Sequence, residues 1–374
     1  MIRYGDYLTP TERLRALNRP LIGLIFTLAV IGFVVLYSAA GGAFFPWALP
    51  QMVRFFIGFG LMIGIAVMDL QWWFKWAYVF YFVSFILLVL VAVMGKVGMG
   101  AQRWLDLYIF KLQPSELVKI SLVLALAAYF HRLNTDDIYK PHHLIIPLLL
   151  IMAPAVLVMK QPDLGTMLLL VMIGFSMLLM AGVRLYYFVG TAIATLAAVP
   201  IVWNVLLKDY QKNRVLTFLD PMTDPQGSGY HILQSKIAIG SGGFFGKGYF
   251  HGTQGYLNFL PEKQTDFIFT LFCEEFGFIG AVLLIFLYVC LLMQAFKIVL
   301  KNRSKFGQLL SFGIMMTLFI YLGINMGMVM GLVPVVGVPL PMISYGGTSM
   351  LTLMMGFGIL LNADVNNRTK VSKY

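Results

Sequence analysis

The sequence has few charged residues and almost no cysteine. Only 11% of its 374 residues are Asp, Glu, Lys or Arg, whereas soluble proteins carry about a quarter. This shortage excludes an ordinary soluble domain. The two cysteines, Cys273 and Cys290, lie in one apolar segment without the spacing of a metal site. We interpret both as small core residues that need no disulfide.

Several catalytic signatures are also missing. No two of the five histidines have the spacing of a catalytic zinc site, and the sequence has no Gly-x-Ser-x-Gly nucleophile elbow. The glycine-rich stretch GSGGFFGKG, residues 240–248, follows no strand and lacks the spacing of a nucleotide-binding loop. We expect a flexible loop there.

Long apolar runs make up most of the sequence, in keeping with its low content of charged residues. Hydrophobic residues make up 60% of the chain, and its mean hydropathy is +0.84. A membrane-spanning helix needs about 20 predominantly apolar residues. We therefore predict an all-α integral membrane protein, a bundle of about ten transmembrane helices. Runs of this length lie near residues 21–40, 52–68, 76–94, 115–130, 144–159, 164–183, 186–206, 266–296, 308–332 and 345–363.

The distribution of Lys and Arg predicts the orientation. Run 21–40 is longer than the roughly 7 to 15 residues of a signal-peptide core, so we expect an uncleaved span. An even number of spans places both termini on one side, and the positive charges there indicate the cytoplasm. The net charge of +11 then suits anionic lipid, with no nucleic acid as partner. The expected organisation is a cytoplasmic segment 1–20, one polytopic domain 21–363 with a long extracytoplasmic loop at about 207–265, and a tail 364–374.

Asp266 lies where the charged stretch LPEKQT gives way to a long apolar run. A carboxylate there can cap a helix or take part in chemistry. Glu262 and Lys263 beside it, and the predicted outer face, favour the second reading. We take Asp266 as the candidate catalytic residue.

Glu116 and Lys119 form a second candidate site. Their i, i+3 spacing puts them on one helix face, and Lys119 lies about one turn into an apolar segment, where a cation needs a partner or a cavity. Pairing between the two is the structural explanation, and a polar cavity lined by both is the functional one that we favour.

Further charged and polar residues lie near the predicted outer face. Arg103 and Trp104 could bind phosphate and stack on a sugar, although snorkelling and an interfacial tryptophan explain them equally. The turn KQPDLGT joins two spans so tightly that its charges stay at the helix ends. Ser344 is read first as a helix cap and second as a substrate contact. The candidate substrate-binding residues are Arg54, Arg103, Trp104, Glu116, Lys119, Lys160, Asp163, Glu262, Lys263 and Ser344.

The motifs PSELVKI, QPDLGT, QSKIAIGSGGFFGKG, LPEKQTDFIF and GLVPVVGVPLPMISYGGTS together resemble the SEDS family of bacterial envelope proteins, and its RodA-like branch more than its division-specific branch. The resemblance implies a peptidoglycan glycosyltransferase that polymerises lipid II on the outer leaflet for lateral wall synthesis and cell shape. It also implies that Asp266 is the essential acid, that Glu116 and Lys119 are the intramembrane pair, and that Trp104 is the outer-loop tryptophan.

The chemistry that the resemblance implies is an inverting transfer. Asp266 is expected to take the proton from a sugar 4-hydroxyl as it attacks the anomeric carbon. The departing lipid diphosphate needs charge neutralisation by Arg, Lys or a divalent cation, Mg²⁺ or Mn²⁺. We expect no other cofactor, and the identity of any metal ligand stays open.

The family also implies partners and a location. We expect a class B penicillin-binding protein, a monofunctional transpeptidase, together with other elongation-complex membrane proteins, in the bacterial cytoplasmic (inner) membrane with the active site facing the periplasm. Two alternatives remain open at this point. A flippase for the lipid-linked precursor would also use ten spans and an intramembrane Glu and Lys pair, and a scaffold for the transpeptidase would need no chemistry.

Overall fold

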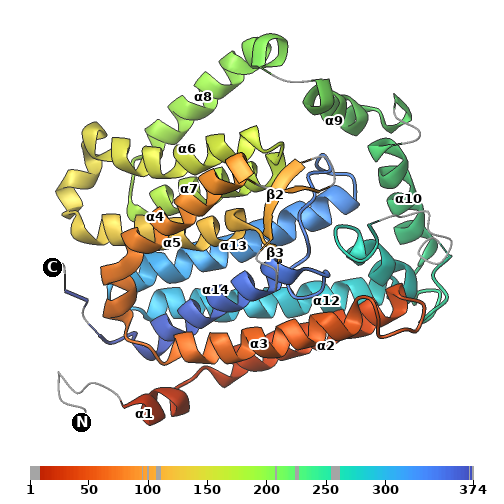
Figure 1. Ribbon diagram of the computed structural model, residues 1–374, viewed down its shortest axis with the longest axis horizontal. Coiled ribbons are helices and arrows are strands. Elements are labelled where there is room, and N and C mark those ends of the chain that lie inside the picture. Colours follow the sequence, from red (N-terminus) through yellow and green to blue (C-terminus); the bar gives the residue numbers. More distant parts are fainter. Residues whose placement is uncertain are drawn as a thin grey trace.

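Helices occupy all ten apolar stretches that the sequence predicts to span a membrane, in the computed structural model of the chain (Figure 1). The structure describes residues 9–94, 96–98, 101–106, 111–206, 209–223, 227–253, 262–369 and 371–372. The predicted N-terminal segment, long loop and tail therefore lie partly outside the described residues, at 1–8, at 207–208, 224–226 and 254–261, and at 370 and 373–374.

Nine helices within the described ranges are long and apolar enough to cross a membrane, which makes the chain a multi-pass membrane protein. Together with α5 (Pro114–Arg132), the long helices are α2 (Arg19–Ala39), α3 (Ala48–Ala66), α4 (Leu70–Met94), α6 (Ile145–Lys160), α7 (Leu164–Ala181), α8 (Leu185–Ile201), α12 (Ile268–Lys301), α13 (Lys305–Val329) and α14 (Gly347–Val365).

Helix α5 is the predicted span that is not among these nine, because of its charged residues. It is 19 residues long, about 28 Å at 1.5 Å per residue, but it carries Glu116, Lys119, His131 and Arg132. Nearly all of its residues are buried, and α4, α6, α7, α13 and α14 pack around it (Figure 1). Glu116, Lys119 and His131 are thus screened from lipid by protein, whereas Arg132 at the end of the helix is exposed.

Side-chain caps define several helix ends. Asn18 accepts a hydrogen bond from the Leu21 amide at the start of α2, and Ser304 accepts one from the Gly307 amide at the start of α13. Gly182 ends α7 with φ of 101°, a left-handed conformation that favours glycine. These caps satisfy backbone groups that the helices leave unpaired.

Both termini lie at one end of the bundle (Figure 1). There the short helix α1 (Pro10–Arg15) places Arg13 against the Val67 carbonyl, with a distance of 2.9 Å. Asp364, near the end of α14, pairs with Lys301 at 3.0 Å and accepts a hydrogen bond from Asn18 at 3.1 Å. These contacts tie together the ends of α2, α12 and α14.

The opposite end carries the shorter elements. A small antiparallel sheet has the order β1 (Lys96–Gly98), β2 (Ala101–Asp106), β3 (Lys111–Leu112). Within the predicted long loop lie α9 (Asp209–Leu219) and α10 (Ser228–Ser241). Helix α8, which precedes them, buries none of its residues and rises away from the bundle (Figure 1).

The glycine-rich stretch 240–248 is not the flexible loop expected from the sequence. It packs against α12 at a break in that helix, where Gly277 has φ of 65° and ψ of −165°. The amides of Lys247 and Gly248 donate to the carbonyls of Glu274 and Glu275, at 3.0 and 3.1 Å. The expectation was wrong because the glycines serve contact with a neighbouring backbone.

At the same break, amides of α12 also donate hydrogen bonds to the glycine-rich stretch. The amides of Phe278 and Ile279 donate to the carbonyls of Gly243 and Phe244, at 2.9 and 3.1 Å. A side chain at Gly246 would collide with the carbonyl of Glu275. The break therefore has its backbone groups paired, and its glycines allow the close approach that this pairing needs.

Candidate active site

Asp266 lies in a turn directly before α12. The N-cap residue of that helix is Phe267, and no side chain caps it, so Asp266 is not the helix cap considered above. Its Oδ2 lies against Gly337, which has φ of +72° and where an added Cβ would come within 3.2 Å of the carboxylate. Among the described residues no group donates a hydrogen bond to this carboxylate. It is therefore available to accept a proton from a bound molecule.

Glu262 stabilises the turn that carries Asp266 by accepting hydrogen bonds from other residues of that turn. Its carbonyl accepts hydrogen bonds from the amides of Thr265 and Phe267, both at 3.2 Å. Its Oε2 accepts a bond from the Thr265 hydroxyl at 2.9 Å. Because these bonds bracket Asp266, they fix the backbone from which its side chain projects.

Two side chains from distant parts of the chain stabilise the same turn by donating hydrogen bonds to its backbone carbonyls. Asn325 on α13 donates to the carbonyl of Asp266 at 3.0 Å and to that of Val338 at 2.7 Å. Ser344 donates to the carbonyl of Thr265 at 2.6 Å. Ser344 does not cap α14, whose N-cap is Gly346. It supports the Asp266 turn instead, and its predicted substrate contact stays a prediction.

The surroundings of Asp266 favour the protonated acid. Burial, with a smaller contribution from the negative charges of Glu262 and Asp163, raises the pKa of this carboxyl to about 6, while Arg103 opposes the shift. Burial likewise lowers the pKa of Lys263. An aspartate with a pKa near the working pH is suited to accept a proton during a reaction and to release it afterwards.

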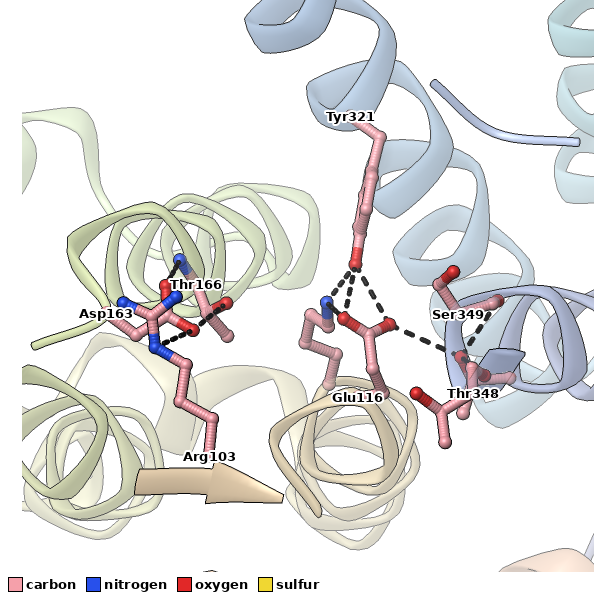
Figure 2. Close-up of polar contacts among 9 residues, drawn as sticks. Arg103, Glu116, Asp163, Thr166, Tyr321, Thr348 and Ser349 are labelled. Carbon is pink, nitrogen blue, oxygen red and sulfur yellow. Dashed lines mark hydrogen bonds and ion pairs between the residues drawn. The ribbon is translucent and has the colours of Figure 1, made fainter. Parts of the chain in front are cut away.

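Arg103 and Asp163 meet at the turn between α6 and α7 (Figure 2). Asp163 caps α7 by accepting bonds from the amide and the hydroxyl of Thr166, at 3.1 and 2.9 Å. Arg103 on β2 lies 3.7 Å from Asp163 and donates to the carbonyls of Gln161 and Pro162. A phosphate could bind Arg103 only by replacing or joining these protein partners.

Trp104 and Lys160, two further predicted substrate-binding residues, are placed differently from Arg103 and Asp163. Trp104 lies beside Arg103 on β2, partly buried and paired in the sheet with Lys96. Lys160 ends α6 with an exposed side chain, whereas Asp163, three residues later, is buried. The structure thus brings Arg103, Asp163, Glu262 and Asp266 within electrostatic reach of one another. It leaves Lys160 at the surface of the same turn.

Glu116 and Tyr321 lie in a second polar cluster, apart from Arg103 and Asp163 (Figure 2), and Lys119 belongs to it through its pairing with Glu116. The side chains of Glu116 and Lys119 pair at 2.7 Å and are almost fully buried. Tyr321 on α13 hydrogen-bonds both of them, and Thr352 on α14 donates to Glu116 at 3.3 Å. All four residues line one pocket between α5, α13 and α14. The predicted pairing therefore occurs, and a pocket lies beside it, but the surface that lines this pocket is mostly apolar. The predicted polar cavity is thus limited to the pair and its hydrogen-bond partners.

Helix α13 connects the two clusters. Tyr321, which contacts Glu116 and Lys119, and Asn325, which holds the Asp266 turn, are four residues apart and share one helix face. Sequence reasoning missed both residues. A tyrosine and an asparagine inside an otherwise apolar span were the signal available.

Arg54 lies on α3 beside the start of α14. Its guanidinium stacks over the ring of Tyr345, with the central carbon 4.8 Å from the ring centroid. It also lies about 3.7 Å from where a side chain at Gly347 would begin. One terminal nitrogen, Nη1, is buried without a hydrogen-bond partner in the described part of the chain. Because this buried N–H donor has lost its hydrogen bonds to water, its burial costs free energy unless an acceptor binds there.

No group of three or more His, Cys, Asp or Glu residues that could hold a metal ion occurs within the described ranges. Asp163, Glu262 and Asp266 influence one another's charge but do not form such a group. A divalent cation shared with a bound diphosphate stays a prediction.

Comparison with known proteins identifies the chain's relatives. Residues 19–369 match the FTSW_RODA_SPOVE model, described as "Cell cycle protein". This chain belongs to that family. It is 41% identical over 355 residues to the peptidoglycan glycosyltransferase MrdB of Escherichia coli (strain K12), an alignment that covers 94% of each chain.

Solved structures agree with this assignment. One, reported as "Structural coordination of polymerization and crosslinking by a peptidoglycan synthase complex", matches with a TM-score of 0.82 and 32% identity over 94% of this chain and 99% of its own. The rod shape determining protein RodA of Thermus thermophilus matches with a TM-score of 0.71 and 27% identity over 94% and 97%. Family members therefore share this fold along most of their length.

Proposed function

We propose that this chain polymerises lipid II with Asp266 as the general base, and that it serves the elongation of the cell wall. The chain is a peptidoglycan glycosyltransferase by its family and by its 41% identity to MrdB across nearly its whole length. The observation that carries the assignment of the base is the Asp266 carboxylate, held in a rigid turn at a helix start with a pKa raised to about 6.

The reaction joins two sugars. The acceptor 4-hydroxyl attacks the anomeric carbon of the donor, the C–O bond to the lipid diphosphate breaks, and the hydroxyl proton passes to the Asp266 carboxylate. The diphosphate leaves with the electron pair of that bond. Attack from the opposite face inverts the anomeric carbon, so an α-linked donor becomes a β-linked polymer.

The leaving group needs positive charge. Arg54 has an orphaned donor at Nη1 and a planar guanidinium already oriented by Tyr345, so it is suited to bind a diphosphate oxygen. Lys119 is engaged with Glu116 and Tyr321. We assign Arg54 to the diphosphate, supported by a divalent cation where one binds, and the Glu116 pocket to the substrate's path through the bundle.

The location follows from the distribution of charge and from the substrate. Lipid II has a lipid tail and a hydrated headgroup, so the reacting groups belong where apolar helices meet an aqueous loop, as at the start of α12. We place this end in the periplasm and both termini in the cytoplasm. The partner that we propose is a class B penicillin-binding protein, because a structural neighbour belongs to a complex described as coordinating polymerisation with crosslinking.

Polymerisation of lipid II by purified protein in detergent tests this function. Glycan ladders should form from the protein alone, or on addition of the transpeptidase with its own active-site serine removed. Detergent presents the substrate without a bilayer, so a flippase or a scaffold would leave lipid II unchanged. Absence of polymer under both conditions, from folded protein, would contradict the proposal.

A further inference from the structure

Two consecutive glutamates are buried within the first part of α12, two turns after Asp266. The Glu274 side chain is 0% exposed and Glu275 is 1% exposed. Neither belongs to the site described above, and neither faces the Glu116 pocket. Burial of a carboxylate is costly unless it is paired, so their partners indicate what they stabilise.

Glu274 is paired with the glycine-rich stretch. Lys247 lies 2.7 Å from Glu274 Oε1, and the hydroxyl of Thr253 donates to the same oxygen at 3.0 Å. Lys247 also donates to that hydroxyl at 2.8 Å. One lysine, one threonine and one glutamate thus form a closed triangle of hydrogen bonds.

Glu275 is paired in the opposite direction, toward α2. Ser38, near the end of α2, donates to Glu275 Oε1. The stretch that follows Lys247 contacts the same part of α2, because the Tyr249 hydroxyl donates to the carbonyl of Val34 at 2.8 Å and the ring of Phe250 lies against Tyr37. Residues 242–253 are therefore held between α2 and the first part of α12.

These contacts determine where the first part of α12, and with it Asp266, is held. The first part of α12 ends at the Gly277 break, so the rest of the helix does not fix its direction. The side chains of Lys247 and Thr253 fix it at Glu274, while Asn325 and Ser344 fix the turn at its other end. Displacement of a catalytic group by about 1 Å can cost two orders of magnitude in rate.

We propose that Lys247, Thr253 and Glu274 form a clasp that positions Asp266, with Lys247 as a positioning residue for the transfer reaction. Lys247 acts through α12, which begins just after Asp266, and does not touch the substrate. This inference rests on the assignment of Asp266 as the base.

The test compares Lys247→Met with Lys247→Arg on lipid II. Lys247→Met should lower kcat by about tenfold or more while KM changes little, because the base is misplaced and the substrate contacts remain. Lys247→Arg keeps the charge and should retain most of kcat. Amide exchange at residues 247 and 248 should speed up in the Met variant, since their bonds to α12 loosen.

A matched control comes from the other end of the bundle. Lys301→Met also removes a lysine from a buried carboxylate, Asp364, at a comparable distance of 3.0 Å. It should lower thermal stability and leave kcat unchanged. If Lys247→Met does not fold, Thr253→Val removes the two hydrogen bonds of the Thr253 hydroxyl at nearly constant shape, leaves the Lys247–Glu274 pair, and should lower kcat in the same direction.

The outcomes separate the clasp from the assignment of the base. An inactive Asp266→Asn beside a Lys247→Met variant with wild-type kcat would overturn the clasp alone. An active Asp266→Asn would overturn the base and the clasp with it. Equal losses of kcat in Lys247→Met and Lys301→Met would reduce the clasp to ordinary stability and overturn the positioning role.

Discussion

At the scale of single residues, the buried and acidic surroundings of Asp266 set its pKa. Burial raises that pKa most, Glu262 and Asp163 add to the shift, and Arg103 opposes it. A base must be deprotonated to work, so the rate should fall as the pH drops through the pKa of Asp266, near 6. Near pH 7 most Asp266 carboxyls are deprotonated and can accept a proton.

Glu262→Gln should move the acid limb of the kcat/KM profile to lower pH, by a few tenths to about one pH unit. The reason is that removing a nearby negative charge lowers the pKa of Asp266, while the glutamine still accepts the hydrogen bond from Thr265. Initial rates between pH 5 and pH 8 measure the shift. Asp136→Asn, an exposed acid outside this turn, is the control and should leave the profile in place. A profile that moves to higher pH would contradict this electrostatic account.

The buried pair makes a different prediction. Removing either Glu116 or Lys119 leaves a buried charge with fewer partners, at a cost of about 3 to 5 kcal/mol in free energy of unfolding. The double variant Glu116→Gln, Lys119→Met should be more stable than either single variant. Thermal unfolding in detergent measures this, and strictly additive losses would contradict coupling between the two residues.

Activity of the double variant tells what the pocket is for. A stable but inactive double variant assigns the pair to the substrate. A stable and active one leaves the pair with a structural role only, because the bundle then tolerates a neutral replacement.

At the scale of elements, Arg54 joins α3 to the start of α14. Arg54→Lys keeps the charge but loses the planar group that stacks on Tyr345. We expect a lower rate of polymerisation at low Mg²⁺ and partial recovery as Mg²⁺ or Mn²⁺ rises. Arg132→Lys, at an arginine that stacks on Phe74 and Tyr78 at the other end of the bundle, is the control. An Arg54→Lys enzyme equal to wild type at every Mg²⁺ concentration would remove Arg54 from the site.

The contact between α10 and α12 depends on a glycine of ordinary helical conformation. A side chain at Gly242 would collide with the carbonyl of Cys273, whereas Gly240, two residues earlier, has open space around it. Gly242→Ala should lower the free energy of unfolding by about 1 to 3 kcal/mol and should lower the rate of polymerisation. Gly240→Ala should be neutral or slightly stabilising. Equal behaviour of the two variants, in thermal unfolding and in rate, would contradict the packing described for this break.

At the scale of the whole molecule, hydrophobic run length predicts the number and place of the helices, because the bilayer sets the length of a span. It cannot predict that the polar helix α5 lies at the centre, since that depends on which helices surround it. The predicted pair Glu116 and Lys119 was accessible because i, i+3 spacing is local. Tyr321, more than two hundred residues away, was not.

The glycine-rich stretch shows the same limit. Its composition fits both a flexible loop and a close backbone contact, and only the partner, the break at Gly277, distinguishes them. The pair of Lys247 and Glu274 is separated by 27 positions, so no local rule links them. Two adjacent glutamates in an apolar span, in FTLFCEE, were nonetheless a visible signal of burial with partners.

The central claim is that Asp266 takes the proton from the attacking hydroxyl. Asp266→Asn keeps the size of the side chain and its capacity for hydrogen bonds, but cannot act as the base. The decisive measurement is the single-turnover rate of glycan formation by Asp266→Asn, with lipid II binding and thermal unfolding followed on the same sample. We predict wild-type folding and binding with no detectable polymer, and polymer formed at the wild-type rate would contradict the account.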